Sequence, residues 1–246
     1  MKHCCITIIT LLVTCTCFAQ SVVRTFYDKA QSQPKEYYHV DADDNIHGKY
    51  TRYYENGRVM MDGHYDHGVK HGQFTEYFES GHTARTMHYV QGMRQGKVEV
   101  FDDYGKTIQT ASYTNDRLAD SVKIFYHTGS DKGKSYFVDG KQEGLVAEYY
   151  DTGTLKRQLT YQHGKPNGPF QTFYKDGKTE TEGTYTNGIL TGTFKTYFAN
   201  GQLETISQMK NGSKNGAFKT YDRDGHLLTV GAFKSCKLHG PNTGYY

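Results

Sequence analysis

The 246-residue sequence has no tryptophan, only four prolines and no marked excess of charge of either sign. Its 29 Lys and Arg residues against 26 Asp and Glu give a net charge of +3, too small to indicate nucleic acid as the main partner. Only 36% of the residues are hydrophobic, which argues against a large aliphatic core. Aromatic residues are abundant instead, and 22 Tyr and 13 Phe favour an ordered β structure over disorder.

Long hydrophobic runs are also missing. The apolar stretch at residues 6–13 is too short to span a membrane. It follows Lys2 and precedes a small-residue end at Ala19, as in a secretory signal peptide. We therefore predict a signal peptide at residues 1–19, which places the protein in the periplasm, the cell envelope or outside the cell.

Cysteine is scarce beyond this segment. Removal of residues 1–19 leaves Cys236 as the single cysteine, so that no intrachain disulfide can form. A lone thiol in an oxidising compartment is either buried or available for an intermolecular disulfide. A competing interpretation of the N-terminus is lipidation at Cys15, but Thr14 fits poorly where that cleavage motif requires Gly, Ala or Ser.

Glycines and aromatic residues recur with a period of 24 residues and without an insertion. One series begins at Gly48 and is broken by Asp120, and a second, beginning at Gly57, is all glycine. A third, beginning at Tyr65, is aromatic except for Met209. The fourth series, which we call the aromatic stripe, consists of Tyr53, Tyr77, Phe101, Phe125, Tyr149, Phe173, Tyr197, Tyr221 and Tyr245.

These series divide the mature chain into repeats. Eight repeats occupy residues 48–239, a lead-in with one capping strand occupies residues 20–47, and a closing strand occupies residues 240–246. Each repeat has two turn signals, such as Asn56-Gly57 and Asn187-Gly188, and we expect both to be two-residue type I′ turns. The predicted fold is all-β: an elongated single-layer antiparallel β-meander of repeated hairpins in a twisted or coiled open sheet.

The predicted turns also fix a register. A two-residue loop at Asn56-Gly57 places Tyr50 opposite Gly63, where an aromatic ring covers a strand glycine. The equivalent pairs in later repeats are Phe74 and Met87, Val122 and Ser135, Val146 and Leu159, Phe170 and Gly183, Phe194 and Ser207, and Phe218 and Gly231. Alternation along the strands puts these pairs on an apolar face and the aromatic stripe on the opposite, polar face.

The repeats resemble the MORN repeats. The segments that carry the resemblance are Tyr65-Asp66-His67-Gly68 and Tyr53-Tyr54-Glu55-Asn56-Gly57, the latter similar to the bacterial MORN-repeat variant of YwqK-like antitoxin-type proteins. The resemblance covers residue 36 to the end. It implies an elongated β-meander used for protein interaction, scaffolding or membrane-proximal attachment. The antitoxin function fits an exported chain poorly, because its toxin would have to be met outside the cytoplasm.

Motifs for catalysis are missing. The sequence has no nucleophile motif and no glycine-rich loop before a helical pattern, so we expect neither enzyme activity nor a cofactor. His64, His67 and His71, with Asp62 and Asp66, suggest a metal site, but their places in the repeat do not force three imidazoles together. We therefore predict no metal site there.

Four aspartates depart from the repeat pattern. Asp120 replaces a glycine of the series that begins at Gly48, and Asp116 replaces a glycine of a further series that begins at Gly68. We expect a local bend or a functional departure at residues 115–121. Asp102 and Asp222 replace an aromatic residue on the apolar face, where a carboxylate must be hydrated or paired.

The expected function is that of an exported, non-catalytic scaffold that binds a protein partner through the aromatic stripe, because Tyr and Phe dominate binding hot spots. The alternative is a binder of envelope glycan or lipid headgroups that uses the same rings with Lys49, Lys195 and Lys219, and a further alternative is an antitoxin or immunity-type protein. The stripe also has a purely structural interpretation, in which its rings shield backbone hydrogen bonds. No nucleic-acid partner is expected.

The apolar face of a single-layer sheet requires cover, which suggests that the sheet coils and self-associates weakly. Residues 36–41 and 245–246 are expected to form the exposed edges of the sheet.

Overall fold

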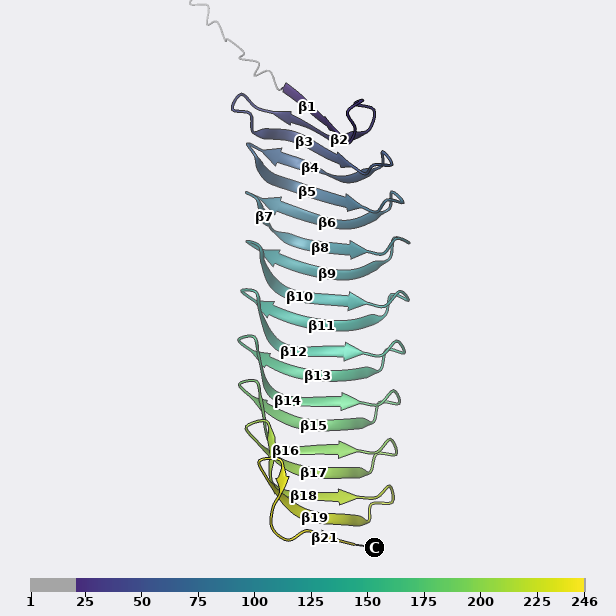
Figure 1. Ribbon diagram of the computed structural model, residues 1–246, viewed down its shortest axis with the longest axis vertical. Coiled ribbons are helices and arrows are strands. Elements are labelled where there is room, and N and C mark those ends of the chain that lie inside the picture. Colours follow the sequence, from purple (N-terminus) through teal and green to yellow (C-terminus); the bar gives the residue numbers. More distant parts are fainter. Residues whose placement is uncertain (1–20, 246) are drawn as a thin grey trace, which may run out of the picture.

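The computed structural model describes residues 21–245, which form one open antiparallel sheet of 21 strands (Figure 1). Within this part of the chain no helix is present, and so none could cross a membrane. The predicted signal peptide and Cys15 lie outside the described residues. The strands are β1 (Ser21–Phe26), β2 (Pro34–Val40), β3 (Ile46–Tyr53), β4 (Val59–Asp66), β5 (Val69–Tyr77), β6 (Thr83–Val90), β7 (Met93–Arg94), β8 (Gly96–Phe101), β9 (Thr107–Thr114), β10 (Arg117–Phe125), β11 (Asp131–Val138), β12 (Lys141–Tyr149), β13 (Leu155–Gln162), β14 (Lys165–Phe173), β15 (Thr179–Thr186), β16 (Ile189–Tyr197), β17 (Leu203–Lys210), β18 (Ser213–Tyr221), β19 (Leu227–Lys234), β20 (Lys237–Leu238) and β21 (Thr243–Gly244).

The strands follow one another along the long axis as a ribbon of stacked hairpins (Figure 1). β7 and β8 are two parts of one strand, since both pair with β6. β20 and β21 both pair with β19, so the closing segment covers the last strand only in part. The expected capping strand is β2, and an additional strand, β1, pairs with it on its outer side. The expectation that residues 36–41 form an exposed edge is therefore wrong, because β1 is the edge.

The two turns of each repeat differ. The turn after β15 is of type I′, as expected, with Asn187 at φ 50° and Gly188 at φ 85°. The turn after β3 is not: the Gly57 N–H donates to the Tyr54 carbonyl, and in this turn only Gly57 has a positive φ, of 80°. This is a type I turn followed by a glycine bulge, and the expected type I′ turn at Asn56-Gly57 is wrong.

The predicted register is nevertheless confirmed. Tyr50 pairs with Gly63, and the six equivalent pairs of the later repeats occur as expected. The glycine bulge adds its extra residue at the end of the hairpin, where the register shifts between Arg52 and Tyr53. The remaining pairs therefore keep the register of a two-residue loop.

Side chains on the apolar face cover one another along the ribbon. Phe74 is fully buried: the rings of Tyr65 and Tyr89 pack edge-on at 5.4 and 5.1 Å, and the Lys70 ammonium lies 4.9 Å from its ring centre. Its ring lies so close to Gly63 that a side chain there would overlap it. A single-layer sheet thus obtains a buried ring by laying it on a strand glycine between two neighbouring rings.

The middle of the ribbon has smaller apolar side chains. Val122 faces Ser135, and on the other face Lys123 lies directly opposite Lys134, a like-charge pair that weakens a sheet. In a repeat protein each unit is stabilised mainly by its neighbours, so a weak unit opens locally.

We therefore expect amide hydrogens of β10 and β11 to exchange faster than those of β4 and β5, measured by hydrogen exchange with mass spectrometry. The replacement Lys134→Thr should slow exchange in β10. Equal exchange along the whole ribbon would contradict this prediction.

The expected bend at residues 115–121 does not occur. Asp116 and Asp120 keep the left-handed backbone of the glycines they replace, with φ of 65° and 62°. The pairing of β9 with β10 shifts between Ala119 and Lys123, as the corresponding pairs of other repeats do. Asp116 also accepts hydrogen bonds from the backbone N–H and the Nε of Arg94, which fasten this turn to the preceding repeat.

Candidate functional site

The aromatic stripe lies on the polar face of the ribbon. Phe125 lines a hollow with Lys97 and Ser121, and the Tyr77 hydroxyl donates to the Asp62 carboxylate at 3.2 Å. Eight of the nine stripe side chains are half-buried, and Tyr245 is 47% exposed. The rings therefore lie against the sheet with part of each ring open to solvent.

The stripe residues occupy the same place in successive hairpins, at the register shift that precedes the glycine bulge. The shift falls between Glu148 and Tyr149, and the same shift occurs one residue before each stripe position from Tyr53 to Tyr221. The glycine of each type I turn thus sets the position of one stripe ring per repeat.

A ladder of tyrosine hydroxyls fixes the backbone of the stripe. Tyr54 donates to the carbonyl of Tyr77, 23 residues later, at 2.7 Å. Equivalent bonds of 2.6–2.8 Å run from Tyr126, Tyr150 and Tyr174 to the carbonyls of Tyr149, Phe173 and Tyr197. In four repeats the donor position is instead held by Phe78, Asp102, Phe198 and Asp222.

The ladder is continuous across three consecutive stripe residues, Tyr149, Phe173 and Tyr197. At its end the Tyr197 hydroxyl and the Lys195 ammonium both donate to Glu182 at 2.8 Å. The bond from Lys195 lowers the pKa of the Glu182 carboxyl, and burial raises the pKa of Tyr197. The cluster is thus an ion pair with a neutral phenol at neutral pH.

Hollows lie beside the stripe on the same face. One is lined by Gln171, Glu182, Thr193 and Lys195, next to Tyr197. The hollow beside Phe125 is lined by Lys97, Thr110, Ser112, Ser121 and Lys123. Rings beside shallow polar hollows are suited to receive side chains of a partner surface.

Asp102 and Asp222 both accept backbone N–H groups of their own turns, and each also pairs with a histidine. Oδ1 of Asp102 accepts the backbone N–H of Tyr104 at 3.0 Å and that of Lys106 at 2.9 Å, and Oδ2 lies 3.0 Å from Nδ1 of His127. Asp222 makes the same bonds to Asp224 and His226. Each carboxylate therefore closes the turn that it begins, which explains an acidic residue at an aromatic position.

The bonds from His127 and from the Lys106 backbone lower the pKa of Asp102. A lowered pKa in the folded state means that stability is present at neutral pH and is lost as the pH falls below about 4. Asp102→Asn should lower the melting temperature at pH 7 and flatten its decline in acid. The control is Asp151→Asn at an exposed turn position, and an unchanged acid profile of Asp102→Asn would contradict this prediction.

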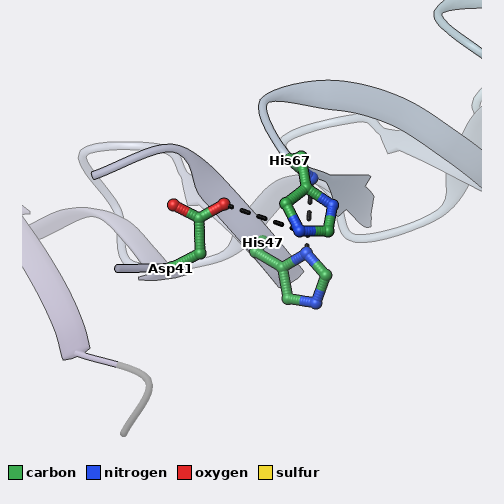
Figure 2. Close-up of side chains that lie close together, drawn as sticks. All are labelled: Asp41, His47 and His67. Atoms are coloured by element: carbon green, nitrogen blue, oxygen red, sulfur yellow. Dashed lines mark hydrogen bonds and ion pairs between the residues drawn. The ribbon is translucent and has the colours of Figure 1, made fainter. Parts of the chain in front are cut away.

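The histidines that lie together in the structure are not the three considered as a metal site in the sequence. His64 pairs with His71 across β4 and β5, whereas His67, in the next turn, lies beside His47 and Asp41 (Figure 2). The ring centres of His47 and His67 are 4.5 Å apart. Sequence reasoning missed this group. A signal was present, because His47 and His67 are 20 residues apart, and in later repeats a side chain accepts the backbone N–H of the turn residue 20 positions after it.

Cys236 is exposed and has a positive φ of 64°. Its thiol is therefore available at the surface, which matches the second of the two roles considered for it.

Five segments of the chain match the MORN repeat variant: residues 46–67, 70–91, 142–163, 166–187 and 190–211. Their starting points differ by 24 residues or by a multiple of 24. The intervening repeats have the same two-strand hairpin in the structure. No curated protein matches the chain.

Three solved structures show weak likeness. A mutant of S. aureus TarM is 10% identical, with a TM-score of 0.28 over 39% of this chain, and the match spans only 19% of that protein. A porin-like protein from Bacteroides uniformis is 10% identical, with a TM-score of 0.22 over 92% of this chain and 94% of the other. TcdB2-TccC3 is 12% identical, with a TM-score of 0.18 over 92% and 14% of the two chains. TM-scores this low carry no argument about function.

Proposed function

The chain is a MORN-repeat protein, and from this we propose that it is an exported, non-catalytic scaffold that binds a protein partner through the polar face of its ribbon. The central contact is the segment of the aromatic stripe at Tyr149, Phe173 and Tyr197. The observation that supports the proposal is the hydroxyl ladder, because it fixes the backbone that carries these three rings at the same position in successive repeats.

Fixed rings are favourable for binding for two reasons. Tyrosine and phenylalanine contribute a large contact area, and tyrosine adds a polar tip. A site whose side chains are already ordered loses less conformational entropy on association. The Glu182 and Lys195 pair at the end of this segment adds charges that could fix the orientation of a partner.

The alternative of glycan or lipid headgroup binding relies on three lysines. Lys49 and Lys219 are exposed, but Lys195 is paired with Glu182 and so is less available to an anionic headgroup. This pairing favours a protein partner over a headgroup. Headgroup attachment should weaken as salt rises, whereas stacking on sugars should not.

We expect the mature chain from Gln20 to capture one protein from an envelope extract. The variant Tyr149→Ser, Phe173→Ser, Tyr197→Ser should lose this protein while keeping its circular dichroism spectrum. The matched control, Phe137→Ser, Tyr161→Ser, Tyr185→Ser, changes half-buried rings of the opposite face and should retain it.

Two results would overturn the proposal. If only glycan or lipid is recovered, the alternative function replaces it. If the stripe variant captures the same protein as the parent chain, the stripe is structural and the binding surface lies elsewhere. A captured toxin would favour the antitoxin or immunity-type function at the same face.

A further inference from the structure

Three side chains, two from turns and one from a strand, converge at the N-terminal end of the ribbon (Figure 2). Asp41 directly follows β2, His47 is the second residue of β3, and His67 lies in the turn between β4 and β5. One ligand atom from each lies within 4.8 Å of the others. Two imidazoles and a carboxylate are the donor types that zinc and similar divalent metals prefer.

The carboxylate of Asp41 has one oxygen that is held and one that is free. Oδ1 accepts the backbone N–H groups of Asp43 at 3.0 Å and Asn45 at 2.9 Å, which fixes the orientation of the group. Oδ2 is buried, has no hydrogen-bond partner and lies 3.9 Å from Nε2 of His67.

The contacts of His67 turn its Nε2 toward Asp41. Nδ1 lies 2.7 Å from Oδ1 of Asp66, so Nδ1 carries the hydrogen and donates it. In the neutral imidazole with this hydrogen, Nε2, which faces Asp41, is the nitrogen that can bind a metal. A carboxylate that orients a histidine through its far nitrogen is a common second partner in metal sites.

His47 contributes the second imidazole, and its Nδ1 lies 3.3 Å from Oδ1 of Asp66. Its Nδ1 accepts the backbone N–H of His67 at 3.3 Å, a long and weak bond. Other repeats place Gln95, Glu143 and Asn167 at this position and make the equivalent bond with an oxygen, at 2.7–3.1 Å. In the first repeat the acceptor is an imidazole, which can also bind a metal.

We propose that Asp41, His47 and His67 bind one zinc-class divalent cation, with Asp66 as a positioning residue. One ligand atom from each of the three side chains borders the same space, and a cation there would give the unpartnered Oδ2 of Asp41 a partner. The separation of 3.9 Å between Oδ2 and Nε2 is about 0.5 Å wider than that of two ligands around tetrahedral zinc, so a small closure of the turns completes the site. The cation would fasten the turn after β2 to the turn after β4.

A second trio in the chain shows the contrast. Asp222, Asp224 and His226 also lie within ligand distance of one another. There Oδ1 of Asp222 accepts two backbone N–H groups, and Oδ2 is paired with Nδ1 of His226 at 3.0 Å. Both oxygens have partners, so this trio closes a turn, and Asp222 lacks the unpartnered oxygen that Asp41 has.

The test is calorimetric titration of the chelator-treated chain from Gln20 with zinc chloride, in a Cys236→Ser background that removes the exposed thiol. The parent should bind one zinc ion. His67→Asn should abolish this binding, and it keeps the turn because Asn187 and Asn211 occupy the same position with φ of 50° and 54°. Asp66→Asn should weaken the affinity about 10–100-fold.

The matched controls are His163→Asn, at the same place in a later repeat, and His226→Asn, and both should bind zinc like the parent. A second measurement is the melting temperature, which zinc should raise relative to EDTA in the parent and not in His67→Asn. The proposal is overturned if the parent binds no zinc, or if His67→Asn and Asp41→Asn bind it as tightly as the parent does. Neither result depends on the partner-binding function of the stripe.

Discussion

Replacing Phe74 with alanine is expected to lower the free energy of unfolding by about 3–5 kcal/mol. The ring is fully buried, and its loss opens a cavity between Tyr65 and Tyr89 that a strand glycine cannot fill. Denaturant unfolding followed by tyrosine fluorescence measures the change. Phe194→Ala, at the same place in a later repeat but half-buried, is the control and should cost less. Equal losses in the free energy of unfolding for the two variants would contradict this prediction, because they would show that the deeper burial of Phe74 does not contribute to stability.

Replacing Gly63 with valine should lower the free energy of unfolding by about 1–3 kcal/mol, because the new side chain overlaps the Phe74 ring and forces it from its place. Ser135→Val is the matched control. Ser135 has the same place in its repeat but faces the smaller Val122, so valine there should be neutral or stabilising.

The two substitutions should also be strongly non-additive. Once Phe74 is alanine, the ring that a side chain at Gly63 overlaps is gone. The coupling energy in a double-mutant cycle should then fall in the range of about 0.5–3 kcal/mol for contacting residues. A coupling of zero would contradict the account of a ring laid on a strand glycine.

Much of this fold could be predicted from the sequence because a strict 24-residue period repeats the same information eight times. The pairing of Tyr50 with Gly63 followed from residue counting alone, and it survives although the turn at Asn56-Gly57 is of another type. The sequence could not separate the two turn types, because a type I turn with a glycine bulge and a type I′ turn both end in glycine. The bulge displaces only the stripe residue beside it.

Features outside the period were harder to predict. β1 has no counterpart among the repeats, so no series pointed to it. The anomaly at Asp102 was visible, but its partners are the backbone of its own turn and His127, which only the folded turn brings together. The bend expected at Asp116 and Asp120 fails because aspartate adopts the left-handed backbone that the turn requires.

In the candidate site, too, the features that follow the 24-residue period could be predicted and the others could not. The nine positions of the aromatic stripe and their polar face could be predicted from alternation along the strands. The hydroxyl ladder that singles out Tyr149, Phe173 and Tyr197 could not, since it depends on side chains of one repeat reaching the backbone of the next. Asp41 belongs to the lead-in, so the group that it forms with His47 and His67 has no periodic signal.

The most direct test of the proposed function is photo-cross-linking from the two faces of one hairpin. A photoreactive phenylalanine is placed at Tyr149 on the polar face or at Tyr161 on the apolar face, both half-buried and on adjacent strands. The mature protein is then irradiated in the envelope extract. We predict a discrete protein adduct from position 149 and none from position 161. The same adduct from both positions, or an adduct from position 161 alone, would contradict the proposal that the aromatic stripe is the binding surface.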